Sequence, residues 1–184
     1  MTEPFELNGI NHLALVCRDM ERTVDFYTNV LGMPLIKTIE LPFDMGQHFF
    51  FDCGNGDAVA FFWFPNSPEP APGVAAPKGL PGIEELASAM GSMNHVAFNV
   101  APEHIEEYRD RLIAAGVVCT EIANHDDSEY GVSRTVDEGV YVRSVYFQDP
   151  DGILLELACW LRRPEGAADE VAIIPRRALQ PVVE

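Results

Sequence analysis

Three residues of this chain have types and settings that suit metal chemistry. "INHLALVC" contains His12 and "MNHVAFNV" contains His95, and each is an apolar stretch interrupted by Asn-His. Glu156 interrupts a third apolar stretch, "ILLELACW", where a carboxylate is costly to bury without a cation. Two imidazoles and one carboxylate are the ligands of a facial triad with open coordination positions. Taken alone, each His is also explained as a hydrogen-bonded core residue and Glu156 as a solvated edge residue, so both interpretations stay open.

The segments that must position these residues follow one order twice. The pattern predicts a strand, a helix and three strands over residues 10–17, 20–32, 34–41, 46–53 and 58–64. It predicts the same order over residues 93–100, 102–116, 117–123, 140–148 and 153–160. Such an internal repeat indicates two similar units related by a pseudo-twofold axis.

Domain organisation follows from this repeat. The first module is predicted over residues 8–67 and the second over 93–162, with a C-terminal tail at 163–184. Between the modules, residues 68–92 form a Pro-rich linker, because no central strand or helix interior tolerates so much proline. A short helix around residues 83–90 is expected within the linker.

Composition restricts the class of partner. The net charge of −17 argues against nucleic acid and against an anionic membrane surface, since both require basic patches. No apolar run reaches membrane-spanning length, and the acidic start of the chain is unlike a signal peptide. The four cysteines lack CxxC spacing and are expected to be reduced thiols. We therefore expect a cytoplasmic protein that acts on a small molecule.

Three longer stretches resemble the vicinal oxygen chelate superfamily, which includes glyoxalase I, extradiol dioxygenases and the fosfomycin- and bleomycin-resistance proteins. They are "INHLALVCRDMERTVDFYTNVLGMPLI", "MNHVAFNV" and "VYFQDPDGILLELACW", and the resemblance covers about residues 8–162. It implies an α+β fold in which two paired βαβββ modules form curled mixed sheets around a metal-binding cleft. It also implies metal ligands at His12, His95 and Glu156, and a homodimer.

Within this superfamily, the metal-site pattern is most similar to type I extradiol dioxygenases. Glyoxalase I carries a ligand Glu in the fourth strand of its first module, whereas "AVAFFWF", around Phe61, has no ligand. "YFQDPDGILLE" resembles the dioxygenase ending and matches Tyr146 to the tyrosine that hydrogen-bonds the substrate oxygen. The implied metal is Fe(II), with Mn(II), Zn(II) or Ni(II) as alternatives. The implied reaction is ring cleavage of a catechol-like substrate with vicinal oxygens.

This resemblance is incomplete, and other functions stay open. The catalytic His that the dioxygenases carry before that fourth strand is absent, and Asp57 lies in its place. One alternative is a non-oxidative metalloenzyme of the same superfamily: an isomerase or epimerase, a lyase, or a fosfomycin-type transferase. Another is a metal-free binding or resistance protein.

Two further residues are candidates for a catalytic role. His125, in the polar loop 124–139, is a candidate general base, or else a plain exposed histidine. Arg143 is a candidate for holding a substrate carboxylate, or else forms a salt bridge with one of the many acidic residues. The aromatic run from Phe61 to Phe64 is expected to be mostly core, with one or two rings lining an apolar substrate pocket.

Overall fold

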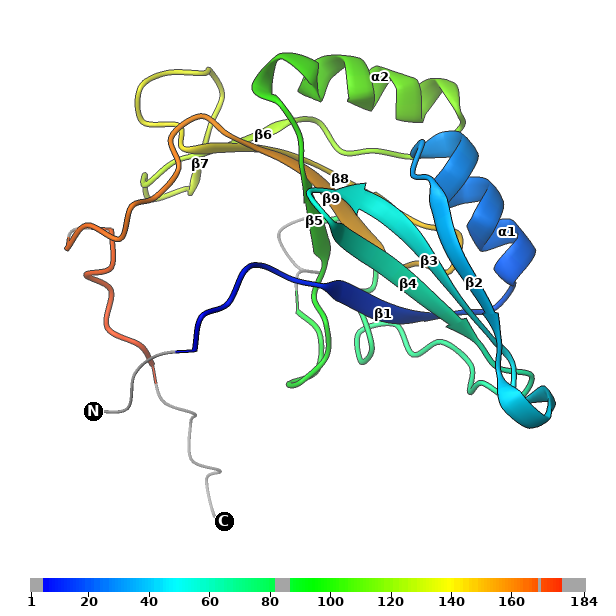
Figure 1. Ribbon diagram of the computed structural model, residues 1–184. Coiled ribbons are helices and arrows are strands. Elements are labelled where there is room, and N and C mark those ends of the chain that lie inside the picture. Colours follow the sequence, from blue (N-terminus) through cyan, green and yellow to red (C-terminus); the bar gives the residue numbers. More distant parts are fainter. Residues whose placement is uncertain (1–4, 82–86, 169, 177–184) are drawn as a thin grey trace, which may run out of the picture.

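The structure, a computed structural model, describes residues 5–81, 87–168 and 170–176 and contains two mixed β-sheets with few helices (Figure 1). The elements of the first module are β1 (His12–Cys17), α1 (Met20–Asp25), a π-helical turn (Phe26–Val30), β2 (Leu35–Glu40), a 3₁₀ turn (Pro42–Asp44), β3 (Gln47–Gly54) and β4 (Asp57–Trp63). Their sheet has the order β1-β4-β3-β2, with β1 parallel to β4 and the other pairs antiparallel.

The second module repeats this plan. Its elements are β5 (Val96–Asn99), a 3₁₀ turn (Pro102–His104), α2 (Ile105–Ala114), β6 (Ala123–His125), β7 (Val132–Ser133), β8 (Val142–Gln148) and β9 (Leu154–Trp160). Their sheet has the order β5-β9-β8-β6-β7, and here too the first strand runs parallel to the last long strand. The predicted α+β class and the repeat of strand, helix and strands are confirmed, and neither sheet closes on itself.

Strand alternation gives the first sheet one packed face and one open face. Leu15 and Phe61 are register partners on the face that joins the hydrophobic core. The alternate residues of β1, which are His12, Ala14 and Val16, are exposed on the other face. The apolar face packs because this removes hydrocarbon from water, whereas His12, Ala14 and Val16 on the other face remain exposed.

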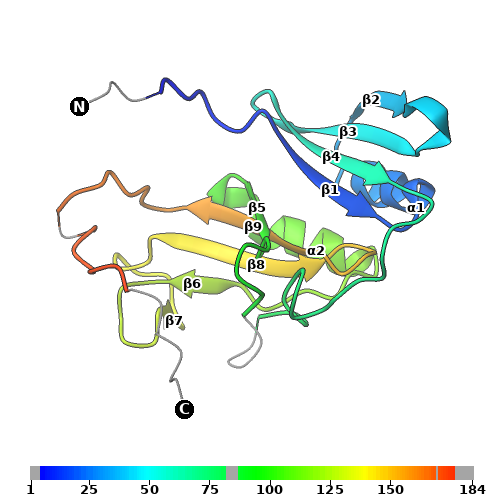
Figure 2. The same ribbon diagram turned by 90° about the horizontal axis from the view of Figure 1, so that it is seen from below.

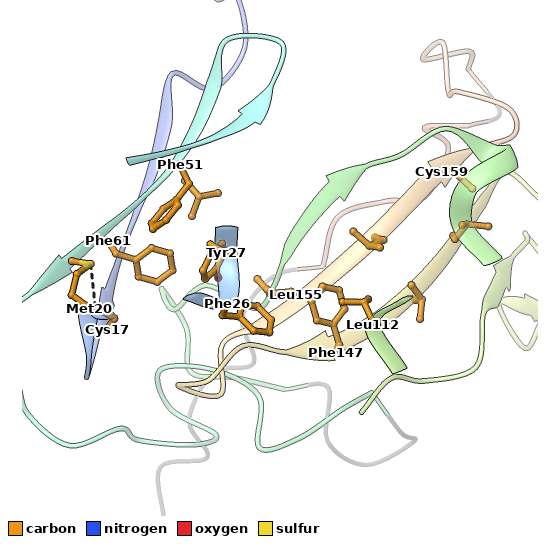
Figure 3. Packing of buried hydrophobic residues seen from close by; sticks show 14 residues of the cluster. Cys17, Met20, Phe26, Tyr27, Phe51, Phe61, Leu112, Phe147, Leu155 and Cys159 are labelled. Atoms are coloured by element: carbon orange, nitrogen blue, oxygen red, sulfur yellow. Dashed lines mark hydrogen bonds between the residues drawn. The ribbon is translucent and has the colours of Figure 1, made fainter. Parts of the chain in front are cut away.

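The two modules are joined through residues that follow helix α1. Figure 3 shows Phe26 and Tyr27 between the buried residues of the two sheets. The ring of Tyr27 is centred 4.8 Å from that of Phe61, and its hydroxyl donates to Asp149 of the second module over 3.3 Å. Figure 2 shows the sheets as separate layers. The contact between the modules therefore does not use the open face that carries His12.

Two predicted elements differ from the structure. The helix expected over 20–32 is α-helical only to Asp25 and then continues as a π-helical turn. The strand expected over 117–123 was wrong, because in that segment only Cys119 forms an isolated bridge before β6 begins at Ala123. Thr120 accounts for this difference: its backbone N–H donates to the carbonyl of Tyr146, but its hydroxyl accepts the N–H of Tyr146 and its carbonyl accepts from Arg109. Side chains thus take two places that backbone groups fill in a regular ladder.

Three smaller expectations can also be compared with the structure. Part of the short helix expected at 83–90 lies outside the described residues, and residues 87–90 are not helical. All four cysteines are free thiols. Within the described ranges, no helix is long and apolar enough to cross a membrane.

Candidate metal centre

The second sheet brings two of the three candidate ligands together. His95 immediately precedes β5, and Glu156 lies in the middle of β9, where it is the register partner of Ala97. Nε2 of His95 is 2.9 Å from Oε2 of Glu156, and the Glu156 side chain is only 7% exposed. Glu156 is therefore a buried carboxylate whose partner is an imidazole.

The contact between His95 and Glu156 shifts the pKa values of both side chains. The hydrogen bond to Glu156 raises the pKa of His95, which outweighs its partial burial. Burial pushes the pKa of Glu156 upward, but the hydrogen bond from His95 and the nearby charges hold it below its usual value. Nδ1 of His95 also lies 2.8 Å from Oδ1 of Asn94. Both ring nitrogens of His95 thus face side-chain oxygens, and the contact with Glu156 favours the charged form of each partner.

Tyr146 and His125 extend this cluster along the same face. Tyr146 on β8 is the register partner of Glu156, and its ring is centred 5.9 Å from that of His95. Its hydroxyl lies 3.4 Å from Nε2 of His125. His125 was expected in a polar loop, but it ends strand β6, where pairing with Val142 turns it toward this face. Burial, and then the charge of Glu156, raise the pKa of Tyr146 to about 12, so its hydroxyl keeps its proton.

His12 repeats the setting of His95 on the first sheet. Its Nδ1 lies 2.7 Å from Oδ1 of Asn11, just as Asn94 contacts His95. The same contact between an asparagine side chain and Nδ1 of the following histidine therefore occurs in both modules.

One chain does not bring His12 to the other two candidates. Among the residues that the structure describes, no three His, Cys, Asp or Glu side chains gather closely enough to hold a metal ion. A metal site with three protein ligands would therefore need a third ligand from outside this group, such as a second copy of the chain. The strand that carries the extra ligand in glyoxalase I contributes none here, since Phe61 is buried and the other face of β4 carries Ala58, Ala60 and Phe62, which have no ligand atoms.

Arg143 is not brought into the cluster. It alternates with Ser144 and Tyr146 along β8 and so points to the opposite face. There its guanidinium donates to Glu106 of α2 over 2.7 Å and to Asn124 over 3.1 Å. The structure therefore contains the salt bridge, which was the alternative interpretation of this residue.

His48 on β3 is a residue that sequence reasoning missed. It is the register partner of Phe62 and faces the same side of the first sheet as His12. Its Nε2 is buried without a hydrogen-bond partner. Burial, followed by the charge of His12, lowers its pKa. The alternation within "GQHFFFDC" was the available signal, because it places His48 and Phe50 on one face.

Comparisons with known proteins agree with this architecture. The family model described as "Glyoxalase/Bleomycin resistance protein/Dioxygenase superfamily" matches residues 9–157. Metallothiol transferase FosB of Shouchella clausii (strain KSM-K16) is 27% identical over 152 residues, covering 82% of this chain and 80% of the relative. Glyoxylase I 4 of Arabidopsis thaliana is 26% identical over 157 residues, covering 84% of this chain and 72% of the relative.

A solved structure shows the same fold. The fosfomycin resistance protein FosX of Listeria monocytogenes, in complex with Mn(II) and sulfate, has a TM-score of 0.52 at 21% identity and covers 84% of this chain and 93% of that one. These matches do not show the expected similarity to extradiol dioxygenases in particular. The family match over most of the chain and the repeated module are sufficient for the broader assignment: the chain belongs to the glyoxalase/bleomycin resistance protein/dioxygenase superfamily.

Proposed function

We propose that this protein is a divalent-metal-dependent enzyme that transfers a nucleophile, such as a thiol, to a small substrate with neighbouring oxygen atoms. The observation that carries the proposal is the contact of 2.9 Å between His95 and the buried Glu156, together with a second Asn-His pair at His12. Two imidazole nitrogens and one carboxylate oxygen suit first-row divalent ions. Mn(II) is our first choice because FosX of Listeria monocytogenes was solved with it, and Fe(II), Zn(II) and Ni(II) are the alternatives.

We propose further that the third ligand is His12 of a second copy of the chain. The face that carries His12 is exposed, and so are Ala97 and Asn99 beside Glu156 on the second sheet. If the first sheet of one copy faced the second sheet of the other, His12 of one copy would lie opposite His95 and Glu156 of the other. A twofold axis then generates two identical sites from two chains.

Within such a site, this chain's own residues handle the proton and the substrate oxygen. The bound metal would act as a Lewis acid on the substrate oxygens. Tyr146 keeps its proton and donates a hydrogen bond to a substrate oxygen. His125, whose Nε2 lies 3.4 Å from the Tyr146 hydroxyl, accepts the proton of the attacking nucleophile.

A non-oxidative reaction is better supported than the ring cleavage expected from the sequence. The curated relatives reported above are named as a metallothiol transferase and a glyoxylase. Where the dioxygenases carry a catalytic His at the start of this strand, the chain has Asp57, the first residue of β4. Both observations favour nucleophile transfer, with isomerisation as the nearest alternative.

Mixing two defective variants tests the shared site. His12→Ala and Glu156→Gln should each fail to bind Mn(II), because each removes one ligand from every site. After subunit exchange, each mixed dimer contains one intact site and one doubly defective site. Random mixing should therefore restore about a quarter of the wild-type Mn(II) stoichiometry.

The outcomes of that experiment are distinct. If the His12→Ala variant bound Mn(II) without mixing, His12 would not be a ligand. No recovery on mixing, with mixed dimers verified by differently tagged chains, would place the whole site in one chain.

The reaction itself is tested on Mn(II)-loaded protein with a panel of thiols and epoxide, hemithioacetal and catechol substrates. Nucleophile transfer predicts a thiol adduct of an epoxide, seen by NMR, without oxygen uptake. Oxygen uptake with a catechol would instead return the assignment to ring cleavage, and conversion of a hemithioacetal alone would indicate an isomerase.

A further inference from the structure

A continuous row of rings runs along the open face of the first sheet, starting next to His12. The ring centroids of His12 and Phe50 are 5.5 Å apart, and those of Phe50 and His48 are 4.3 Å apart. His48 then stacks on Phe62 at 3.6 Å, and Phe62 stacks on Phe64 at 5.3 Å. We call His48, Phe50, Phe62 and Phe64 the ring strip.

Between the ring strip and β1, strand β4 carries two small residues on this face. Ala58 is the register partner of His12, and Ala60 is the register partner of both Ala14 and Phe50. Both alanines are buried, so the accessible surface next to His12 comes from the side chains around them, including the half-buried rings of the strip. Such a surface can receive a planar group, because rings pack on one another in offset or edge-on geometries.

Two properties of the ring strip are unfavourable in water. Phe64 is 36% exposed, and Val16 on the neighbouring strand is 49% exposed. Nε2 of His48 is buried without a hydrogen-bond partner. Contiguous exposed apolar surface and an unsatisfied buried nitrogen are both typical of a surface that is completed by a ligand.

We propose that the ring strip binds a flat aromatic part of the substrate while the neighbouring oxygens of the same substrate lie at His12. This inference rests on the proposed function, and it adds the substrate class: an aromatic compound with chelating oxygens rather than a short aliphatic one. The ring strip begins next to His12, since the rings of His12 and Phe50 are 5.5 Å apart. An aromatic ring bonded directly to the chelating oxygens or their carbon could therefore reach the strip. Side chains of a second copy are the competing occupant.

Two hydroxamates with the same chelating oxygens test this proposal. Benzohydroxamate carries a phenyl ring and acetohydroxamate carries a methyl group, and each is titrated by calorimetry into protein loaded with Mn(II). We expect benzohydroxamate to bind about tenfold more tightly, which is the order expected from one well-packed aromatic contact.

Variants of the ring strip locate the preference. His48→Ala and Phe62→Leu should bring the affinity ratio of the two hydroxamates close to one, while acetohydroxamate affinity and Mn(II) stoichiometry stay unchanged. His48→Phe is the matched control, because it keeps a ring at this position and should keep the ratio. Thermal melting of each variant verifies that it is folded.

Each outcome either supports or overturns the inference. Equal affinities in the wild type would overturn it and would indicate that side chains of the second copy cover the ring strip. A preference that survives both His48→Ala and Phe62→Leu would place the aromatic group elsewhere. A protein that takes up no Mn(II) would overturn the proposed function and this inference with it, which the metal measurement distinguishes from a loss of ring preference alone.

Discussion

At the scale of single residues, the two Asn-His pairs differ in one respect that decides their chemistry. His95 already has Glu156 as a partner at Nε2, whereas the described contacts of His12 are Asn11 at Nδ1 and the ring of Phe50. Glu156 therefore favours a proton on His95. Under the proposed function, a divalent ion at Nε2 of His95 would compete with that proton, since metal-bound imidazole is neutral at the binding nitrogen.

The first prediction concerns this proton. Because Glu156 raises the pKa of His95 above 6.5, metal affinity should fall as the pH drops through that raised value. In metal-free protein, Glu156→Gln should lower the titration midpoint of the His95 ring, followed by NMR. Glu107→Gln, which removes the carboxylate beside His104 instead, is the control and should leave the His95 midpoint unchanged. An unchanged midpoint in Glu156→Gln would contradict the role given to this carboxylate.

The second prediction concerns the hydroxyl of Tyr146. Tyr146→Phe keeps the ring against His95 but removes the donor that lies 3.4 Å from His125. We expect kcat to fall by about 10²-fold, with Mn(II) affinity unchanged, because the hydroxyl acts on the substrate oxygen and not on the ion. Turnover and metal titration on the same sample measure the two effects. An equal loss of metal affinity would show that the hydroxyl supports the ligands instead.

At the scale of elements, strand β8 presents different chemistry on its two faces. Tyr146 and Ser144 share the face of Glu156, while Arg143, the residue before Ser144, faces α2 and forms an ion pair with Glu106. A shift by one residue would exchange these two sets. The side-chain partner of Arg143 on the helix therefore helps to keep the register that the site needs.

The third prediction tests this structural role of Arg143. Arg143→Met should lower the free energy of unfolding by about 1 kcal/mol and leave Mn(II) affinity unchanged. Arg111→Met removes a more exposed pair with Glu107, at 3.9 Å, and should cost less. Urea unfolding and metal titration give the two readouts. If Arg143→Met were as stable as the wild type but bound substrate more weakly, Arg143 would have a role in substrate binding instead.

At the scale of the whole molecule, the modules depend on a buried polar contact. Tyr27 of the first module donates to Asp149 of the second, and both side chains lie within the packed interior. Backbone N–H groups of Asp151 and Ile153 also donate to Asp149. Burial nevertheless dominates and raises the pKa of Asp149 from 3.8 to about 6.

The fourth prediction follows from the sign of that shift. Between pH 4 and 6, the folded protein holds a proton on Asp149 that the unfolded chain has released, so stability should fall as the pH rises, by about 3 kcal/mol at most. Asp149→Asn keeps an acceptor for the backbone and cannot ionise, so its stability should depend less on pH in this window. Denaturant unfolding at several pH values compares the two proteins. If stability depended equally on pH in the two proteins, the pKa of Asp149 would not be raised in the folded state.

Sequence reasoning succeeded where local pattern is sufficient. The faces of His12, His95 and Glu156 could be predicted because side chains alternate between the two faces of a strand. Each of these polar residues also stands out within an apolar stretch. It failed at residues 117–123, where the Thr120 hydroxyl and the Arg109 guanidinium take two of the hydrogen bonds that backbone groups make in a regular ladder. It also missed His48, whose importance comes from a stack on Phe62 that belongs to a neighbouring strand.

The sequence by itself determined the repeated module and the face on which each candidate ligand lies, because periodicity and composition are local properties. Only the tertiary structure decided which candidates meet. It joined His95 to Glu156, moved His125 from a loop to the edge of the site, and turned Arg143 toward α2. The packing of Tyr27 between the modules sets how the two sheets lie, and this depends on contacts between residues far apart in the chain. No pattern within a single strand contains that information.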